Sequence, residues 1–215
     1  QAMGVDSWVP RDASTEMPEA IPDATVTLDV IPVVCETSLE TLKDQVTTCQ
    51  QCTLGQSRTQ TVFGVGNPNA DLMFIGEAPG QQEDRQGEPF VGRAGLLLNE
   101  MLLSIGLSRD DIFIANILKC RPPNNRDPNP EEVVSCTPFL LQQIDLIQPK
   151  LIISLGRISA HFLLNTKTAL GKLRADIHHY HNTPLIATYH PAYLLRSPGE
   201  KARAWDDFQR IKGYL

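Results

Sequence analysis

Asp71-Leu-Met-Phe-Ile-Gly76, a short apolar run followed at once by the turn Glu77-Ala-Pro-Gly80, decides the fold class of this 215-residue chain. An apolar run of this length that ends in a glycine-rich turn is typical of a strand buried on both faces of a parallel sheet. Comparable runs recur at 112–116, 151–155 and 185–189. We therefore expect these four segments to form the centre of one sheet.

Helical stretches lie between the predicted strands. One begins after Ser38, a second occupies 94–105 and ends at a glycine cap, and others are expected from near Asn129, from Arg157 and from near Gly199. This alternation predicts an α/β fold, a three-layer α/β/α sandwich with a mostly parallel central sheet. Ligands of such sheets bind beyond the carboxyl ends of the strands.

The chain divides into a tail at 1–37 and one domain at 38–215. The segment 12–34 is rich in Pro, Ala, Thr and acidic residues without apolar periodicity, so we expect a flexible acidic tail. The formal net charge of the chain is −6. The first 48 residues carry nine acidic and two basic side chains, so the remaining residues are nearly neutral overall. A DNA-binding face then requires that cations cluster near the predicted site. Candidates for such a face are Lys119, Arg121, Arg126, Arg157, Arg196, Lys201 and Arg203.

Two features of the chain indicate where the protein acts. It contains no apolar run near eighteen residues and no basic start followed by an apolar stretch, so we expect a cytoplasmic protein without a membrane segment. In a reducing compartment, five cysteines favour metal binding or inert thiols over disulfides. We expect a monomer.

Four of the cysteines have the layout of a metal centre. Cys49 and Cys52 form a close pair, and Cys120 and Cys136 flank a proline-rich loop. The pair can reach one ion or cluster, and the other two thiolates can supply the remaining corners. Buried free thiols are the alternative. Cys35 lies in the tail and is expected to be incidental.

The extreme N-terminus carries apolar anchors ahead of the acidic stretch. Residues 3–10 read Met-Gly-Val-Asp-Ser-Trp-Val-Pro, and an accessible Trp in such a place is typical of a docking peptide. Over about ten residues this segment resembles the N-terminal peptide of the psi subunit of bacterial DNA polymerase III. A peptide at 1–11 that docks on a replication protein is therefore one hypothesis; a terminus that packs on its own domain is the other.

Several longer motifs follow the predicted strands in one order. They are Gly76-Glu-Ala-Pro-Gly80, Gly87-Glu-Pro-Phe-Val-Gly-Arg-Ala-Gly95, the segment 116–126, and Tyr189-His-Pro-Ala-Tyr-Leu-Leu-Arg196. Together with the cysteine spacing, they resemble a family 4 uracil-DNA glycosylase from about residue 40 to the C-terminus. The resemblance implies excision of uracil from double- or single-stranded DNA by hydrolysis of the N-glycosidic bond, the first step of base excision repair. It also implies a 4Fe-4S cluster held by Cys49, Cys52, Cys120 and Cys136.

The resemblance assigns a uracil pocket to residues of these motifs. Phe90 is expected to stack on the base. Asn116 can accept from N3–H and donate to O4 of uracil, whereas cytosine presents the reverse pattern. Glu83 is expected to fill the space beside C5 and so to exclude thymine, and Ala78 stands where family 1 enzymes place a water-activating aspartate. The neighbouring Asp84 is expected to be an ordinary surface carboxylate.

Two residues are expected to stabilise the charges of bond cleavage. Breaking the bond leaves positive charge on the sugar and negative charge on the departing base. By similarity, His190 donates to uracil O2 as that charge develops, and Glu77 stabilises the sugar cation and orients water. Taken alone, a histidine before a proline is more often a structural residue.

DNA contacts are predicted on either side of this pocket. Tyr193, Leu194 and Leu195 are expected to wedge into the duplex while Arg196 holds phosphate. The stiff cationic loop containing Arg121, Asn124 and Arg126 is expected to pinch the backbone beside the flipped nucleotide.

Three alternatives to uracil turnover are a covalent trap, a non-catalytic module and electron transfer. Related uracil-binding proteins trap DNA covalently through a histidine in the loop after the second strand, but the segment 119–126 contains no histidine. A non-catalytic DNA-binding or replication-docking module would need only the tail and the metal centre. Electron transfer through the cluster ranks lower, because cysteine spacing says nothing about redox potential.

Overall fold

A computed structural model of the chain describes residues 38–214. The predicted tail at 1–37, with its docking peptide and Cys35, and the last residue lie outside the described residues. Among those described, no helix has the length and apolar character needed to cross a membrane.

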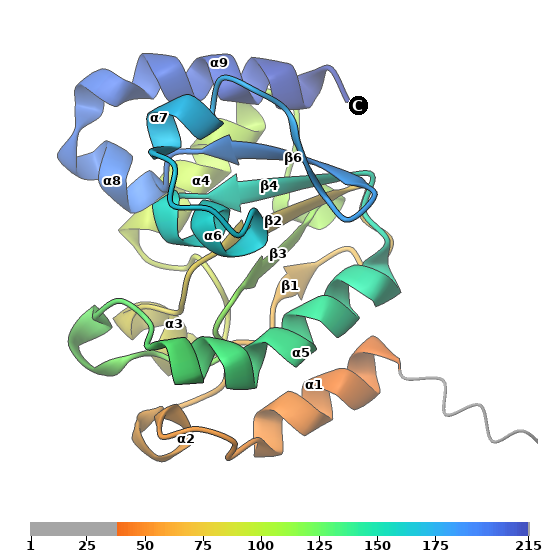
Figure 1. Cartoon of the computed structure of the whole chain (residues 1–215), viewed down its shortest axis with the longest axis vertical. Helices are drawn as coiled ribbons and strands as arrows, with labels where there is room; N and C mark the ends of the chain where they lie inside the picture. Colours follow the sequence, from red (N-terminus) through yellow and green to blue (C-terminus); the bar gives the residue numbers. More distant parts are fainter. Residues whose placement is uncertain (1–37, 215) are drawn as a thin grey trace, which may run out of the picture. The chain divides into compact units, whose positions relative to one another are not determined.

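The centre of the domain is a six-stranded sheet with the order β1-β3-β2-β4-β6-β5 (Figure 1). The four inner strands pair in parallel, and the two edge strands pair antiparallel to their neighbours. The strands are β1 (Val65–Gly66), β2 (Leu72–Gly76), β3 (Phe113–Asn116), β4 (Leu151–Leu155), β5 (His178–Tyr180) and β6 (Thr183–Thr188).

Alternate side chains of the inner strands supply two separate apolar cores. In β2, Met73 and Ile75 belong to one core, and Leu72 and Phe74 belong to the other. All four are essentially inaccessible to solvent. Because successive strand residues point to opposite faces, a continuous apolar run is what a sheet covered on both faces requires.

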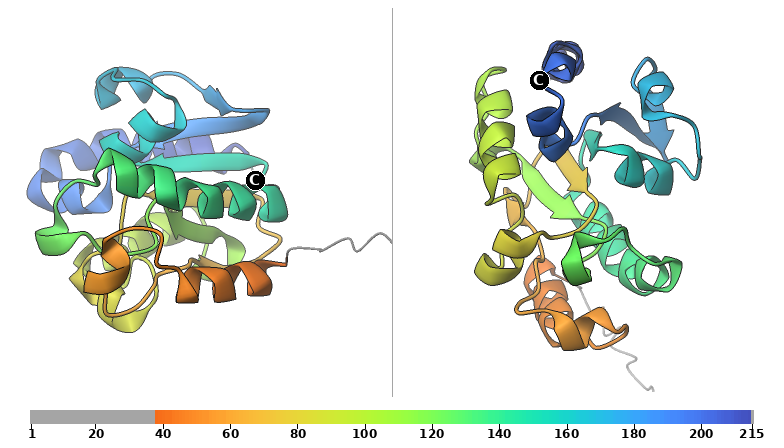
Figure 2. Two further views of the ribbon diagram at one scale, coloured as in Figure 1. Left: turned by 60° about the horizontal axis from the view of Figure 1, so that its bottom comes forward. Right: turned by 90° about the vertical axis from the view of Figure 1, so that its left-hand side faces the viewer.

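Helices cover both faces of the sheet, which Figure 2 shows edge-on. The two covering layers are α4 (Arg93–Leu103) with α9 (Lys201–Lys212), and α5 (Pro130–Ile147) with α6 (Arg157–Leu163), α7 (Leu170–Leu173) and α1 (Leu39–Thr48). The predicted three-layer α/β/α sandwich with a mostly parallel sheet is confirmed.

The predicted boundaries agree with the structure for long elements. The helix expected near Asn129 begins at Pro130, with Asn129 and Glu132 forming a reciprocal capping box. Gly106, just beyond α4, has φ of +87°, which suits the expected glycine cap. The elements not predicted are short: β1, β5, α7, α2 (Leu54–Ser57), α3 (Gln81–Gln86), α8 (Pro191–Arg196), and 3-10 turns at Arg109–Asp111, Pro123–Asn125 and Pro198–Glu200.

A buried carboxylate on α9 pairs with Arg174 at the end of α7 and accepts a hydrogen bond from the end of β6. Asp207 accepts hydrogen bonds from Arg174 Nε at 2.6 Å and from Thr188 Oγ1 at 2.6 Å. The Arg174 guanidinium also lies 4.4 Å from the centre of the Tyr189 ring, a cation–π contact. Since Tyr189 directly precedes His190, this pair supports the chain where it enters the predicted site.

We expect Asp207→Ala to lower the free energy of unfolding by about 3–5 kcal/mol, because it strands a buried guanidinium. The matched control is Asp71→Ala, which removes an exposed pair with Lys150 and should change stability by less than about 1 kcal/mol. Urea unfolding of both variants measures the difference. Equal losses would contradict the assignment.

Candidate active site and cysteine centre

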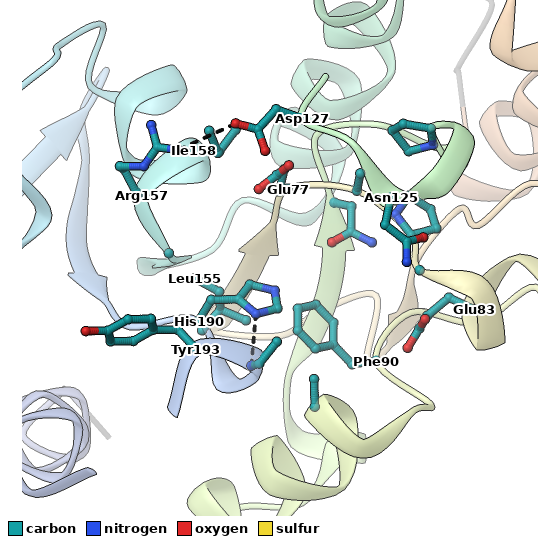
Figure 3. Close-up of a pocket in the computed structure, with 18 of the residues that line it drawn as sticks. Glu77, Glu83, Phe90, Asn125, Asp127, Leu155, Arg157, Ile158, His190 and Tyr193 are labelled. Carbon is teal, nitrogen blue, oxygen red and sulfur yellow. Dashed lines mark hydrogen bonds and ion pairs between the residues drawn. The ribbon is translucent and has the colours of Figure 1, made fainter. Parts of the chain in front are cut away.

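A cavity of about 680 Å³ opens at the carboxyl ends of the parallel strands (Figure 3). The segments that follow β2, β3, β4 and β6 all contribute to its wall. The predicted pocket residues Glu77, Ala78, Glu83, Phe90, Asn116 and His190 all line it. The structure thus brings together side chains that are more than one hundred residues apart in the sequence.

Two rings form one side of this cavity. The ring centres of Phe90 and His190 are 5.4 Å apart, with their planes 30° from parallel (Figure 3). Gly76 at the tip of β2 permits this arrangement, since a methyl group there would lie 2.3 Å from Asn116 Oδ1 and 2.9 Å from Phe90 Cζ. The glycine therefore lets the aromatic ring and the amide sit over the strand end.

The hydrogen bonding of His190 fixes which ring nitrogen faces the cavity as a donor. Its Nδ1 accepts from the Ala192 backbone N–H at 3.1 Å, so the neutral ring carries its proton on Nε2. Burial and, to a smaller extent, the charge of Arg196 lower the pKa of His190 to about 4, although Glu83 opposes this shift. His190 is therefore a neutral N–H donor near pH 7.

Asn116 presents a buried acceptor without a partner. Its side chain is 2% exposed, and Oδ1 has no hydrogen-bond partner within the described residues. The buried side chain of Lys119 holds the Asn116 backbone in place. Lys119 Nζ donates to the Asn116 carbonyl at 2.8 Å and to Gln143 Oε1 at 2.5 Å. A buried acceptor left unpaired is costly, which points to a ligand donor at this position.

Lys119 itself corrects an expectation. It was expected as a surface cation near DNA, but it is 1% exposed. Burial lowers its pKa to about 8, opposed by the nearby thiols of Cys136 and Cys120. The side chain supports β3 from the interior, so it is not available to phosphate.

The acidic residues of α3 differ in their surroundings. Glu83 lines the cavity, and its Oε1 accepts from the backbone N–H groups of Val91 and Gly92 at 3.1 and 3.0 Å. The expectation that Asp84 is a surface carboxylate is wrong: it is 4% exposed and accepts from the Thr59 N–H at 2.9 Å. Asp84 instead anchors α3 to the segment that precedes β1.

Glu77 sits at the cavity wall beside a charged pair (Figure 3). Arg157 at the start of α6 lies 3.5 Å from Asp127. Burial and, to a smaller extent, the charge of Asp127 raise the pKa of Glu77 to about 7, although Arg157 opposes this shift. The carboxyl group of Glu77 therefore titrates near neutral pH.

The predicted wedge residues all lie on α8 but differ in their exposure to solvent. Tyr193 and Leu195 are 38% and 36% exposed, and Tyr193 lines the cavity together with Arg196. Leu194 is 1% exposed and packs in the core with Tyr189 and Ala204, so its prediction as a DNA wedge is wrong. Residues 191–196 form the helix α8, which was not predicted, and its geometry directs this side chain inward.

The cationic loop that was predicted to pinch the DNA backbone is held by hydrogen bonds and an ion pair within the protein. Arg121 Nε donates to Asn125 Oδ1 at 2.7 Å, and Arg126 forms a two-point pair with the buried carboxylate of Glu132 at 2.5 and 2.9 Å. Asn124 is exposed with φ of +55° and does not line the cavity. Arg126 and Asn125 do line it.

Sequence reasoning missed one part of the cavity wall. Asp127, Gly156 and Ile158 line the cavity, as does Arg157, which was predicted only as a candidate cation of a DNA-binding face. Gly156 and Arg157 directly follow β4, so the rule that parallel strands end at one rim could have identified them. No motif drew attention to that strand end.

The four predicted cysteine ligands line one small pocket beneath α5. Cys120 Sγ accepts from Arg58 Nη1 at 3.1 Å, and Cys136 Sγ accepts from the Lys119 backbone N–H at 3.2 Å. Over residues 38–214, no three His, Cys, Asp or Glu side chains are grouped closely enough to hold a metal ion. Four thiols around one pocket, two of them accepting from N–H donors, form a donor set that suits a thiolate-bound metal centre.

Comparison with known proteins identifies the class that this fold and cavity define. The sequence profile of the Uracil DNA glycosylase superfamily matches residues 63–209, and the chain belongs to this superfamily. Within it, the chain is similar to type-4 uracil-DNA glycosylases: 44% identical to that of Archaeoglobus fulgidus (81% of this chain, 92% of the relative), 45% to that of Sulfurisphaera tokodaii (81% and 84%) and 41% to that of Thermotoga maritima (84% and 96%). The family expected from the motifs is confirmed.

The raised pKa of Glu77 predicts a pH-dependent effect on stability. The folded protein binds this proton up to about pH 7, whereas an unfolded glutamate loses it near 4.5. Ionisation between these values therefore opposes folding increasingly as the pH rises. We expect Glu77→Gln to raise the thermal unfolding midpoint at about pH 8 and to leave it unchanged at about pH 4.

Calorimetry at both pH values measures this effect. Glu100→Gln, on the exposed face of α4, is the matched control and should show no pH-dependent difference. A gain for Glu77→Gln that is equal at the two pH values would contradict the prediction.

Proposed function

We propose that the enzyme excises uracil from DNA, the first step of base excision repair, by hydrolysing the N-glycosidic bond of a flipped nucleotide. The observation that most supports this proposal is the buried Oδ1 of Asn116, which has no hydrogen-bond partner among the described residues and shares the cavity with Phe90 and the neutral His190. An acceptor, an aromatic face and an N–H donor in one cavity match the N3–H, the ring and the carbonyl oxygens of uracil.

Entry of the base requires that it leave the duplex, at a cost of a few kcal/mol in lost stacking. Tyr193 and Leu195, exposed on α8 next to the cavity, are the groups that replace this stacking. Arg196 at the same helix end and Arg121 in the opposite loop are assigned to the phosphates. Asn124 and Arg126 shape that loop, and Leu194 anchors α8 to the core.

Base selection rests on Asn116 and Glu83. The Asn116 amide accepts N3–H through Oδ1 and donates to O4 through Nδ2, a pattern that cytosine cannot satisfy. A site built on such hydrogen bonds can reject the mismatched edge by as much as ~10⁴. Glu83, held by two backbone N–H groups, closes the cavity where the 5-methyl group of thymine would lie, and Ala78 leaves room for the base.

Cleavage develops negative charge on uracil and positive charge on the sugar. His190 donates from Nε2 to O2 as the charge grows, a contribution of roughly 3 kcal/mol for one such donor. Because Nδ1 accepts from the Ala192 N–H, the neutral ring donates from Nε2 without a change in its protonation state. Ionised Glu77 stabilises the cation and orients water, so excision should increase as the pH rises through about 7.

The four cysteines are proposed as ligands of a 4Fe-4S cluster, with Arg58 and the Lys119 amide donating to sulfur. Such a cluster cross-links the segments that carry its ligands and brings positive charge that favours thiolates. Its ligands here come from the loop after α1, the segment that follows β3, and α5. This role is structural and leaves the reaction to the cavity residues.

The proposed partners follow from this activity. The substrate is uracil-containing DNA, double- or single-stranded, and the enzyme is proposed to act as a monomer in the cytoplasm. The peptide at 1–11 is proposed to dock on a replication protein, which would bring repair to newly copied DNA.

We expect Asn116→Ala and His190→Ala each to slow uracil excision by at least about 100-fold while keeping most of the affinity for DNA. Excision is measured on an end-labelled duplex with one uracil, cleaved with alkali and resolved on a denaturing gel, beside thymine and cytosine controls. Affinity is measured by fluorescence anisotropy.

The exposed His179 on β5 supplies the control variant His179→Ala, which should be fully active. If affinity falls as much as rate, the assigned roles are wrong. An intact strand with the unchanged chain would favour the docking module, and a protein–DNA band that survives denaturation would favour the covalent trap.

Substitution of a ligand tests the metal centre separately. We expect Cys120→Ser to lose iron, acid-labile sulfide and the broad visible absorption of an iron-sulfur cluster, and to unfold at lower temperature, because a buried thiolate contact is lost. Cys35→Ser should keep all three signals. Zinc in place of iron in the unchanged chain would overturn the assignment.

A further inference from the structure

Phe90 occupies a backbone conformation that its side chain does not favour. Its φ is +54°, in the left-handed region that bulky L-residues rarely adopt. Such a conformation persists only where the surroundings hold it, and it is concentrated at functional sites. In this conformation the ring is 6% exposed, lies over Gly76 and faces His190 (Figure 3).

A side chain outside the cavity holds this turn. Arg109 lies in the 3-10 turn before β3, and it does not line the cavity. Its Nη2 donates to the Pro89 carbonyl at 2.6 Å, and its Nη1 donates to the Phe90 carbonyl at 3.1 Å. Nη1 also lies 3.2 Å from Asn99 Oδ1 on α4, so one guanidinium joins the turn to the helix behind it.

The contacts of Arg109 are suited to holding a strained turn. The planar guanidinium group of Arg109 donates to two successive carbonyl oxygens at once. The two peptide groups therefore cannot rotate independently of each other. Burial lowers the pKa of Arg109, and Glu88 and Asp110 oppose that shift, so the guanidinium keeps its charge next to these acids. The far side of the Phe90 carbonyl is closed by Gly95, where a methyl group would lie 1.7 Å from the carbonyl oxygen.

We propose that Arg109 is a positioning residue for uracil excision, which fixes the Pro89–Phe90 turn so that the Phe90 ring is preset against the flipped base. The inference rests on the proposed function, since it requires that Phe90 stacks on uracil. Glu83 holds the same turn through Val91 and Gly92, but it also lines the cavity, so Arg109 offers the cleaner test.

The test is a double-mutant cycle with Arg109→Met and Phe90→Ala, measured by single-turnover excision from a uracil-containing duplex. Misplacement of a substrate-contacting group lowers rates by on the order of 10- to 100-fold, and we expect this loss for Arg109→Met. Affinity for a uracil-free duplex should not change. In the Phe90→Ala background, Arg109→Met should cause little further loss, because its effect passes through Phe90.

Two further variants separate positioning from general destabilisation. Arg109→Lys keeps a cation that can donate to a carbonyl and should recover part of the rate; it replaces Arg109→Met in the cycle if that variant does not fold. Arg210→Met removes an arginine that donates to the Arg174 carbonyl at 2.5 Å, outside the cavity wall, and should excise at the normal rate. Thermal unfolding is recorded for all variants.

The outcomes distinguish this inference from the function on which it rests. Full activity of Arg109→Met beside an impaired Phe90→Ala would overturn the inference alone, as would an Arg109→Met loss that persists undiminished in the Phe90→Ala background. Full activity of Phe90→Ala would overturn the stacking role of Phe90, and the inference with it.

Discussion

Parallel pairing of β2 with β3 and β4 is the constraint on which the site depends. The register places Gly76 opposite Asn116 and Ile75 opposite Ser154, so these strands end at one level. Glu77, Asn116 and Gly156 therefore enter the same cavity although they are far apart in sequence. A one-residue slip would exchange the two sets of core side chains between the layers, so their packing against the covering helices favours this register.

Removal of water from this rim sets the chemistry of its titratable groups. The same desolvation acts in opposite directions on an acid and a base, since it disfavours whichever form is charged. It makes His190 a neutral donor and leaves Glu77 balanced near neutral pH between Asp127 and Arg157. A neutral N–H donor at His190 and a carboxyl group that titrates near neutral pH at Glu77 thus arise from one physical cause.

The sheet and most of the cavity could be predicted because they depend on apolar runs and on motifs at strand ends. The burial of three side chains could not be predicted, because it depends on a neighbour distant in sequence or on a short helix. These residues are Asp84, Lys119 and Leu194. Asp84 is buried by its bond to Thr59, and Lys119 by its bond to Gln143. Leu194 is inward because α8 exists, and a six-residue helix has too few turns to produce a periodic pattern.

The exit of β3 ties the cysteine centre to base recognition. Within five residues, Asn116 faces the cavity, Lys119 is buried and Cys120 faces the cysteine pocket. Lys119 contacts both sides, since its Nζ donates to the Asn116 carbonyl while its backbone N–H donates to Cys136 Sγ. The position of the strand end that presents the Asn116 amide is therefore linked to the cysteine pocket through one residue. The cluster proposed for that pocket would act on the cavity through this link in the backbone.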